Sequence, residues 1–170
     1  DAVLTHDRPI HVPCEDSVVA LDDQGSELPV RRSRGYAPLP VTVAVPGARN
    51  ILATGGDLKT TFCLMGGRHA HLSSHLGDMA DPRTQACFES ALDHLAFMTG
   101  RTPEIIACDM HPGYATTAWA RRRAAGRPVV AVQHHHAHAV SLLADHQRLG
   151  SPIVAVTFDG TGYGTDGTIW

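Results

Sequence analysis

The chain has 170 residues, 43% of them hydrophobic, and a formal net charge of −3 at pH 7. These values suit one ordinary domain or parts of two, and they exclude the basic footprint that nucleic acid or an anionic membrane surface would attract. The longest apolar runs, PVVAV and PIVAV, are far too short to span a bilayer. We therefore expect no nucleic-acid partner and no membrane segment.

The termini and the cysteines bear on the cellular context. The chain does not begin with a basic stretch followed by an apolar one, so we expect no secretory signal. Of the four cysteines (Cys14, Cys63, Cys87 and Cys108), no two form a C-x-x-C pair, and the last three lie in apolar stretches where reduced thiols pack as small hydrophobes. These features predict a reduced, cytoplasmic protein. Because the chain lacks a starting Met and stops at DGTIW, which resembles the opening of a strand, we expect a fragment of a longer chain.

The first part of the chain predicts little regular structure. Two short strands are expected at residues 17–21 and 28–32, separated by the turn residues DDQGSE. The stretch YAPLPVTVAVPGARN contains Pro38, Pro40 and Pro46, which predicts an extended connector. This part is too small to form a complete domain.

A hairpin and a helix are predicted next. DLKTTFCLMGGRHAHLSS indicates strand, turn and strand, with Gly66 and Gly67 in the turn, because both central positions of such a turn tolerate positive φ. A helix should then begin at Pro82, with Asp81 as its cap, and end at Gly100. Its apolar face at three- and four-residue spacing consists of Cys87, Phe88, Ala91, Leu92 and Leu95.

From residue 104 onward, buried strands and helices alternate, which is typical of an α/β sheet covered on both faces. In such sheets the ligand crevice lies beyond the carboxyl ends of the strands. The histidine run follows one predicted strand directly, and Asp159 follows the next. The predicted strands are 104–109, 127–133 and 151–160, and the predicted helices are 114–126 and 134–150.

The histidine run VQHHHAHA contains one pair with metal-ligand spacing. In a helix, His134 and His138 lie four residues apart on one face, where two imidazoles can bind one divalent cation. His135 and His138, three apart, are a poorer pair, and surface or capping histidines remain the alternative. Asp159 would complete a set of two histidines and one carboxylate suited to zinc or ferrous iron. Its alternative role is to open the turn DGTG.

Two further segments could contact a phosphate. The loop DGTGYG combines the hydroxyl of Thr161 with Gly160, Gly162 and Gly164, whose backbone N–H groups can approach phosphate oxygens closely. A plain tight turn explains this loop about equally well. Lys59, in the predicted strand after Gly55 and Gly56, could neutralise a phosphate, although a solvated lysine is the simpler interpretation.

Several motifs, in the same order, resemble those of the HypF carbamoyltransferase family of hydrogenase-maturation factors. VQHHHAHA followed by VTFDGTGYGTDGTIW carries the closest resemblance. LKTTFCLMGGRHAHLSSHLGDM resembles the hairpin segment of the family, and PEIIACDMHPGYATT resembles the following strand and loop. DRPIHVPCEDSVV and RRSRGYAPLPV are similar to the end of the family's YrdC-like domain, so the resemblance extends over essentially the whole chain.

The resemblance implies an α/β chain in two parts. Residues 1–45 would be the C-terminal part of a YrdC-like domain with a linker, and residues 46–170 the N-terminal part of a carbamoyltransferase domain with the actin-like ATPase fold. The family uses carbamoyl phosphate and ATP to form carbamoyl adenylate. It then transfers the carbamoyl group to the C-terminal cysteine of the partner HypE, for a cyanide ligand of nickel–iron hydrogenase. The fragment by itself is expected to be inactive, because it lacks the other domains.

The resemblance also assigns residues by position. His134, His138 and Asp159 would bind a divalent metal, zinc or iron. Lys59, the candidate catalytic residue, would lie near the same crevice. Ser17 would belong to the nucleotide site of the YrdC-like domain. Pro13 stands near a position where the family usually has a basic residue. The loop expected to line the phosphate of the adenylate consists of Asp159, Gly160, Thr161, Gly162, Tyr163 and Gly164.

Two other functions stay open from the sequence. An O-carbamoyltransferase of natural-product biosynthesis shares the core and the histidine–aspartate site, but RRSRGYAP joined to LKTTFCL favours hydrogenase maturation. A non-catalytic metal- or nucleotide-binding module is the other alternative, and it predicts metal binding without adenylate chemistry.

Overall fold

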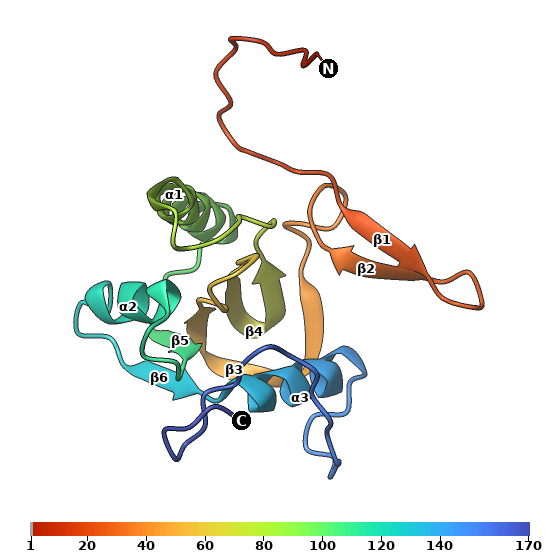
Figure 1. Cartoon of the computed structure of the whole chain (residues 1–170), viewed down its shortest axis with the longest axis vertical. Coiled ribbons are helices and arrows are strands. Elements are labelled where there is room, and N and C mark those ends of the chain that lie inside the picture. Colours follow the sequence, from red (N-terminus) through yellow and green to blue (C-terminus); the bar gives the residue numbers. More distant parts are fainter. Residues whose placement is uncertain (1) are drawn as a thin grey trace.

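The computed structural model describes residues 2–170, which form two sheets and three helices (Figure 1). In the larger sheet the strand order is β4-β3-β5-β6; β3 pairs antiparallel with β4 and parallel with β5, and β5 pairs parallel with β6. A separate antiparallel pair consists of β1 and β2. The strands are β1 (Val18–Leu21), β2 (Glu27–Arg31), β3 (Val41–Ala53), β4 (Cys63–Leu72), β5 (Ile105–Asp109) and β6 (Val129–Val132). The helices are α1 (Pro82–Thr99), α2 (Ala115–Arg122) and α3 (His134–Asp145).

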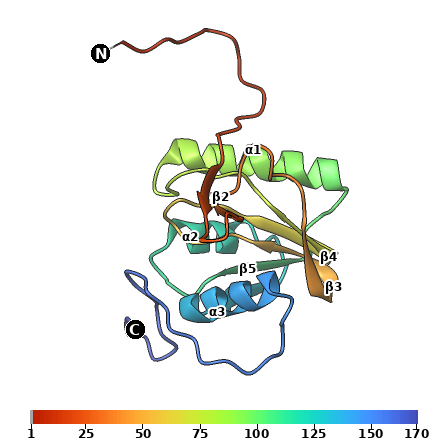
Figure 2. The ribbon, with the colours of Figure 1, turned by 90° about the vertical axis from the view of Figure 1, so that its right-hand side faces the viewer.

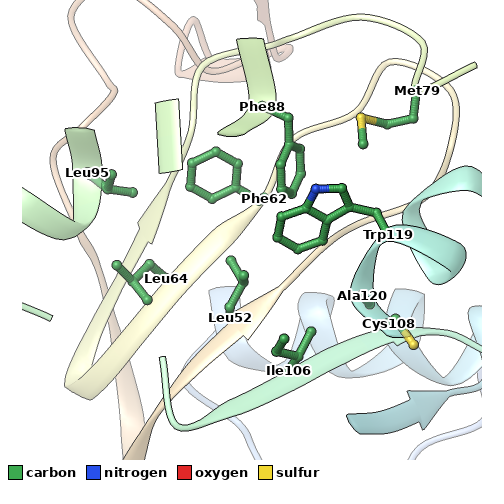
Figure 3. Packing of buried hydrophobic residues seen from close by; sticks show 10 residues of the cluster. All are labelled: Leu52, Phe62, Leu64, Met79, Phe88, Leu95, Ile106, Cys108, Trp119 and Ala120. Atoms are coloured by element: carbon green, nitrogen blue, oxygen red, sulfur yellow. The ribbon is translucent and has the colours of Figure 1, made fainter. Parts of the chain in front are cut away.

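Helices cover both faces of the larger sheet, as predicted for an α/β fold. α1 and α2 lie on one face and α3 on the other (Figure 2). The hydrophobic core lies on the side of α1 and α2, whereas α3 has no buried residue. No helix within residues 2–170 combines the length and the apolar character needed to cross a membrane. The core residues, drawn in Figure 3, are Leu52, Phe62, Leu64, Met79, Phe88, Leu95, Ile106, Cys108, Trp119 and Ala120.

The predicted extended connector after residue 36 is wrong in its second half, because β3 begins at Val41 and runs for 13 residues. The prediction failed because it assumed that Pro46, which cannot donate a backbone hydrogen bond to a neighbouring strand, excludes a long strand here. Here the β3–β4 register shifts on both sides of Gly47, so that Pro46 lies in an irregular part of the strand where its missing N–H is tolerated. The strand pair β1 and β2 was predicted correctly.

The predicted hairpin turn at Gly66 and Gly67 is also wrong, because both residues lie inside β4. Gly67 pairs with Gly47 of β3 and adopts a φ of 59°, so the glycine marks a bulge in a long strand. A side chain at Gly66 would overlap Arg101 and Asn50, which explains the glycine there. The connection from β3 to β4 is instead formed by residues 54–62, and Lys59 therefore lies in a loop.

α1 has the termini that the sequence predicted. The side chain of Asp81 accepts a hydrogen bond from the backbone N–H of Arg83, Pro82 begins the helix, and Gly100 ends it with a φ of 64°. Of the predicted apolar face, Phe88 and Leu95 are buried.

α2 is held at its beginning by a residue from another part of the chain. Its N-cap, Tyr114, makes no capping hydrogen bond through its side chain. The carboxylate of Asp57, in the β3–β4 connection, instead accepts hydrogen bonds from the backbone N–H groups of Ala115 and Thr116, each at 2.9 Å. This contact ties the loop beside the sheet to the helix. α2 ends before the predicted Gly126, since Ala125 and Gly126 form a turn with positive φ.

The last predicted strand, 151–160, is not formed. These residues pair with none of the strands described for residues 2–170, and Ile153, Val154, Val156 and Phe158 are exposed. An apolar β-branched run forms a strand only where another strand offers its backbone groups, so the pattern alone was insufficient. α3 likewise ends at Asp145 rather than near Gly150, before Gln147 adopts a left-handed φ of 56°.

All four cysteines are free thiols, and they differ in burial. Cys108 is buried and Cys63 half-buried, whereas Cys14 and Cys87 are exposed; the prediction that Cys87 packs in the core is therefore wrong. Burial raises the pKa of Cys63 to about 11 and also raises that of Cys108.

These pKa shifts predict the order of alkylation. In the full-length protein at pH 8, iodoacetamide should modify Cys14 and Cys87 at least roughly tenfold faster than Cys63 and Cys108, because the thiolate is the reactive form. A raised pKa keeps Cys63 protonated until the pH approaches about 11, so its alkylation rate should rise with pH through that range. Peptide mass spectrometry over time measures each site, and equal rates for the four cysteines would contradict the prediction.

Candidate metal centre

The histidine run lies where β6 passes into α3. Gln133 is the N-cap, and its side-chain oxygen accepts a hydrogen bond from the backbone N–H of His136 at 2.8 Å. α3 therefore begins at His134, and the four-residue spacing brings the rings of His134 and His138 to a centroid distance of 4.9 Å. The i and i+4 relation that the sequence predicted is present.

Asp159 reaches this pair from the segment after α3. Its Oδ2 lies 3.4 Å from Nε2 of His134 and 3.6 Å from Nε2 of His138. Within residues 2–170, these three residues form a group whose potential ligand atoms all lie within 4.8 Å of one another. The structure therefore brings together the three residues that the sequence nominated, although Asp159 arrives on an irregular segment and not at the end of a strand.

The spacing and chemistry of this group fit a divalent cation. Two ligands bound about 2.0–2.1 Å from a tetrahedral zinc lie roughly 3.3 Å apart, close to the separations of Asp159 from each histidine. Two imidazole nitrogens and one carboxylate are also a donor set used for ferrous iron with open positions. The side chains of His134 and Asp159 are 25% and 17% exposed and that of His138 is 53% exposed, so the group lies at the surface and is open to solvent.

Two further residues contact the candidate ligands: Asp109, which the sequence did not nominate, and His135, which it offered only as a poorer partner of His138. Nδ1 of His134 lies 2.6 Å from Oδ2 of Asp109, which is the last residue of β5. Nε2 of His135 lies 3.0 Å from Oδ1 of Asp159. This hydrogen bond from His135 is the main cause that lowers the pKa of Asp159. The position of Asp109 at the carboxyl end of a strand was the signal that could have identified it.

A cavity of about 450 Å³ lies beside His134 and His138, the two candidate ligand histidines. Small residues form most of its wall, which leaves room for a ligand between β3, β5 and α3. The cavity is lined by Ala53, Gly55, Gly56, Thr61, Ala107, Cys108, Asp109, Val132, His134, Ala137, His138 and Ser141.

The glycine-rich loop packs directly against the histidines. A side chain at Gly162 would overlap the ring of His135, and one at Gly164 would overlap Trp170. Of the glycines after Asp159, Gly167 adopts a positive φ, of 80°. Gly162 and Gly164 therefore allow close packing, whereas a side chain at Gly160 would meet no atom within 4 Å, and contact of the loop with a phosphate stays a prediction.

The other residues of the loop contact neighbouring segments. Thr161 Oγ1 lies 3.4 Å from the hydroxyl of Tyr114, and the backbone carbonyl of Tyr163 accepts a hydrogen bond from Gln133. The ring of Tyr163 meets that of His111 edge-on, at a centroid distance of 5.4 Å. The loop is thus anchored to the segment between β5 and α2.

Lys59 and Ser17 occupy other surroundings. Lys59 is exposed, and its backbone N–H donates to Asp78. It is not among the residues that line the cavity, whereas Gly55 and Gly56 of the same loop are. The hydroxyl of Ser17 accepts from the N–H of Ser33 and donates to the carbonyl of Arg34, which ties together the region of the two-stranded sheet.

The comparisons with known proteins agree with one another. A family model described as the HypF Kae1-like domain matches residues 46–145. The chain is 42% identical over its whole length to a carbamoyltransferase HypF from Synechocystis sp. and 40% identical to one from Rhizobium leguminosarum, and it spans 22% of each. It thus covers about a fifth of the length of these curated relatives.

Two solved structures are also similar. Full-length HypF in its phosphate- and nucleotide-bound form superposes with a TM-score of 0.88 at 38% identity, covering 98% of this chain and 26% of that one. HypF from T. kodakarensis superposes with a TM-score of 0.80 at 29% identity, covering 92% of this chain and 20% of that one.

Proposed function

Since the chain belongs to the HypF family and carries its Kae1-like domain, we propose that it is part of a carbamoyltransferase. The complete protein would use carbamoyl phosphate and ATP to form carbamoyl adenylate. It would then transfer the carbamoyl group to the C-terminal cysteine of a HypE-like acceptor, in the cytoplasm, for the cyanide ligand of nickel–iron hydrogenase. Residues 1–45 would complete a YrdC-like domain, and residues 46–170 would begin the transferase domain.

The convergence of His134, His138 and Asp159 beside a cavity is the observation that carries this proposal. The three residues would hold a divalent cation, zinc or iron. When bound, such a cation supplies a Lewis acid that stabilises negative charge on carbamoyl or phosphate oxygens.

The chain's own groups would prepare the site around this cation. His135 donates to Oδ1 of Asp159 and leaves Oδ2 directed toward His134 and His138. The loop from Gly160 to Gly164 lies against the ring of His135 and would position the phosphate of the adenylate. The nucleophile would be the thiolate of the acceptor protein, and no cysteine of this chain is given that role.

The test is a reconstitution with the full-length protein. ATP should be converted to AMP in a reaction that requires carbamoyl phosphate, and mass spectrometry should then find one carbamoyl group on a HypE-like acceptor. A matched acceptor with serine in place of its C-terminal cysteine should stay unmodified. AMP formation that ignores carbamoyl phosphate, or an acceptor that gains no mass, would contradict the proposed function.

A further inference from the structure

A buried carboxylate lies behind one of the candidate ligands. Asp109 ends β5 and its side chain is 7% exposed. Oδ1 accepts a hydrogen bond from the backbone N–H of His111 at 2.8 Å, and Oδ2 lies 2.6 Å from Nδ1 of His134. Both oxygens are therefore occupied, one by the backbone of the next loop and one by the imidazole.

The contact determines which nitrogen His134 can offer. A carboxylate is an acceptor only, so a neutral imidazole at this distance must carry its proton on Nδ1 and donate it to Asp109. The lone pair then lies on Nε2, the atom that is 3.4 Å from Oδ2 of Asp159. Two carboxylates thus flank the ring of His134. The shorter contact, to Asp109, identifies Nδ1 as the protonated nitrogen and leaves Nε2 as the potential ligand atom.

The sheet supplies the placement of this carboxylate. In the parallel register of β5 and β6, Asp109 pairs with Val132, two residues before His134. The same strand pairing that orders the sheet therefore aligns Asp109 with the first turn of α3. His138, whose side chain is 53% exposed, has its ring in a more solvated position.

We propose that Asp109 is a positioning residue that holds the ring and the tautomer of His134, so that Nε2 is presented to a divalent cation. This inference rests on the proposed function, because it presupposes that His134 binds the cation. Partners of this kind raise the basicity of a ligating imidazole and restrict its orientation, and their loss typically weakens metal affinity by about 10–100-fold.

Metal affinity of the full-length protein tests the proposal directly. Zinc binding is measured by competition with a chromophoric chelator for the wild type, Asp109→Ala and Asp109→Asn. We expect Asp109→Ala to weaken the affinity by about 10–100-fold. Asp109→Asn should lose less than Asp109→Ala, because its one carbonyl oxygen can accept from Nδ1 of His134, while its NH2 group then faces the backbone N–H of His111 without an acceptor. This variant also preserves the shape of a buried side chain, and melting temperatures establish that each variant is folded.

A double-mutant cycle separates positioning from a general structural role. In the His134→Ala background, in which His138 and Asp159 are left to bind zinc more weakly, Asp109→Ala should change the affinity less than about twofold. The same loss in both backgrounds would mean that Asp109 supports the fold alone, and the proposal would be overturned. Unchanged affinity of Asp109→Ala in the otherwise wild-type protein would overturn it as well.

The same affinity measurements distinguish a failure of the proposed metal site from a failure of the role assigned to Asp109. If the wild type binds no zinc, or if His134→Ala binds as tightly as the wild type, the metal site itself is wrong and the role of Asp109 falls with it. If His134→Ala loses the metal while Asp109→Ala retains it, the role assigned to Asp109 alone is wrong.

Discussion

Replacement of His134 or His138 by alanine in the full-length protein should weaken metal binding, lower the metal content of the purified protein and slow carbamoyl transfer by about 10²–10³-fold. Each histidine supplies one of three candidate ligand groups whose atoms lie within 4.8 Å of one another, so either substitution leaves two. Loss of a Lewis acid costs several kcal/mol of transition-state stabilisation, and each 1.36 kcal/mol is about a tenfold change in rate. Metal content by mass spectrometry and transfer to the acceptor cysteine are the two measurements.

His136→Ala is the matched control for these variants. His136 lies on the same turn of α3, is exposed, and does not belong to the three-residue group. Its contact with the N-cap is made by its backbone N–H, which alanine retains. We expect this variant to keep both metal and transfer near wild-type levels. Retention of both by His134→Ala and His138→Ala would instead assign the histidines a structural role.

Phe88→Ala should destabilise the domain by about 3–5 kcal/mol, the typical cost of deleting a buried aromatic side chain. Phe88 is fully buried on α1, with ring centroids 5.0 Å from Phe62 and 4.7 Å from Trp119. Its loss would open a cavity where α1, α2 and the sheet meet (Figure 3). Hydrogen exchange in the full-length protein, followed at the backbone amides of β3 and β5, measures the opening free energy of this region.

Phe97→Ala on the same helix provides the comparison. Phe97 is 86% exposed, so its removal should change the opening free energy by less than about 0.5 kcal/mol. Both variants delete the same atoms from α1 and differ chiefly in what the ring contacts. If the two changes were equal, the packing of Phe88 would not be what stabilises this region.

An element could be predicted well where the signals for its start and its end lie in its own sequence, as in α1. The cap, the first proline and the final glycine of α1 all lie within the helix or next to it, so its bounds could be determined without knowledge of its partners. β3 and β4 could not be predicted in this way. Pro46 and the glycines at positions 66 and 67 normally interrupt strands, and only the pairing of β3 with β4 shows that they lie in bulges.

The candidate site follows the same division: the part that depends on one helix turn was predictable, and the part that depends on contacts between distant segments was not. The spacing of His134 and His138 is a property of one helix turn, and the prediction that both rings lie on one face of the helix is confirmed. The contact between His134 and Asp109 spans 25 residues, and it depends on the register of two parallel strands, which the sequence does not specify. His135 could be recognised only once Asp159 was seen to lie between it and the other two histidines.

The segment that carries Asp159 adds a cost in conformational entropy to any binding at the site. Residues 151–158 form neither helix nor strand, so the backbone that delivers this carboxylate has no ladder of hydrogen bonds to fix it. Fixing one residue of such a segment costs about 1–2 kcal/mol in conformational entropy, which subtracts from the affinity of any cation that Asp159 binds. His134 and His138 are ordered in advance by α3. Affinity at this site therefore depends on how firmly the rest of the molecule holds residues 151–158.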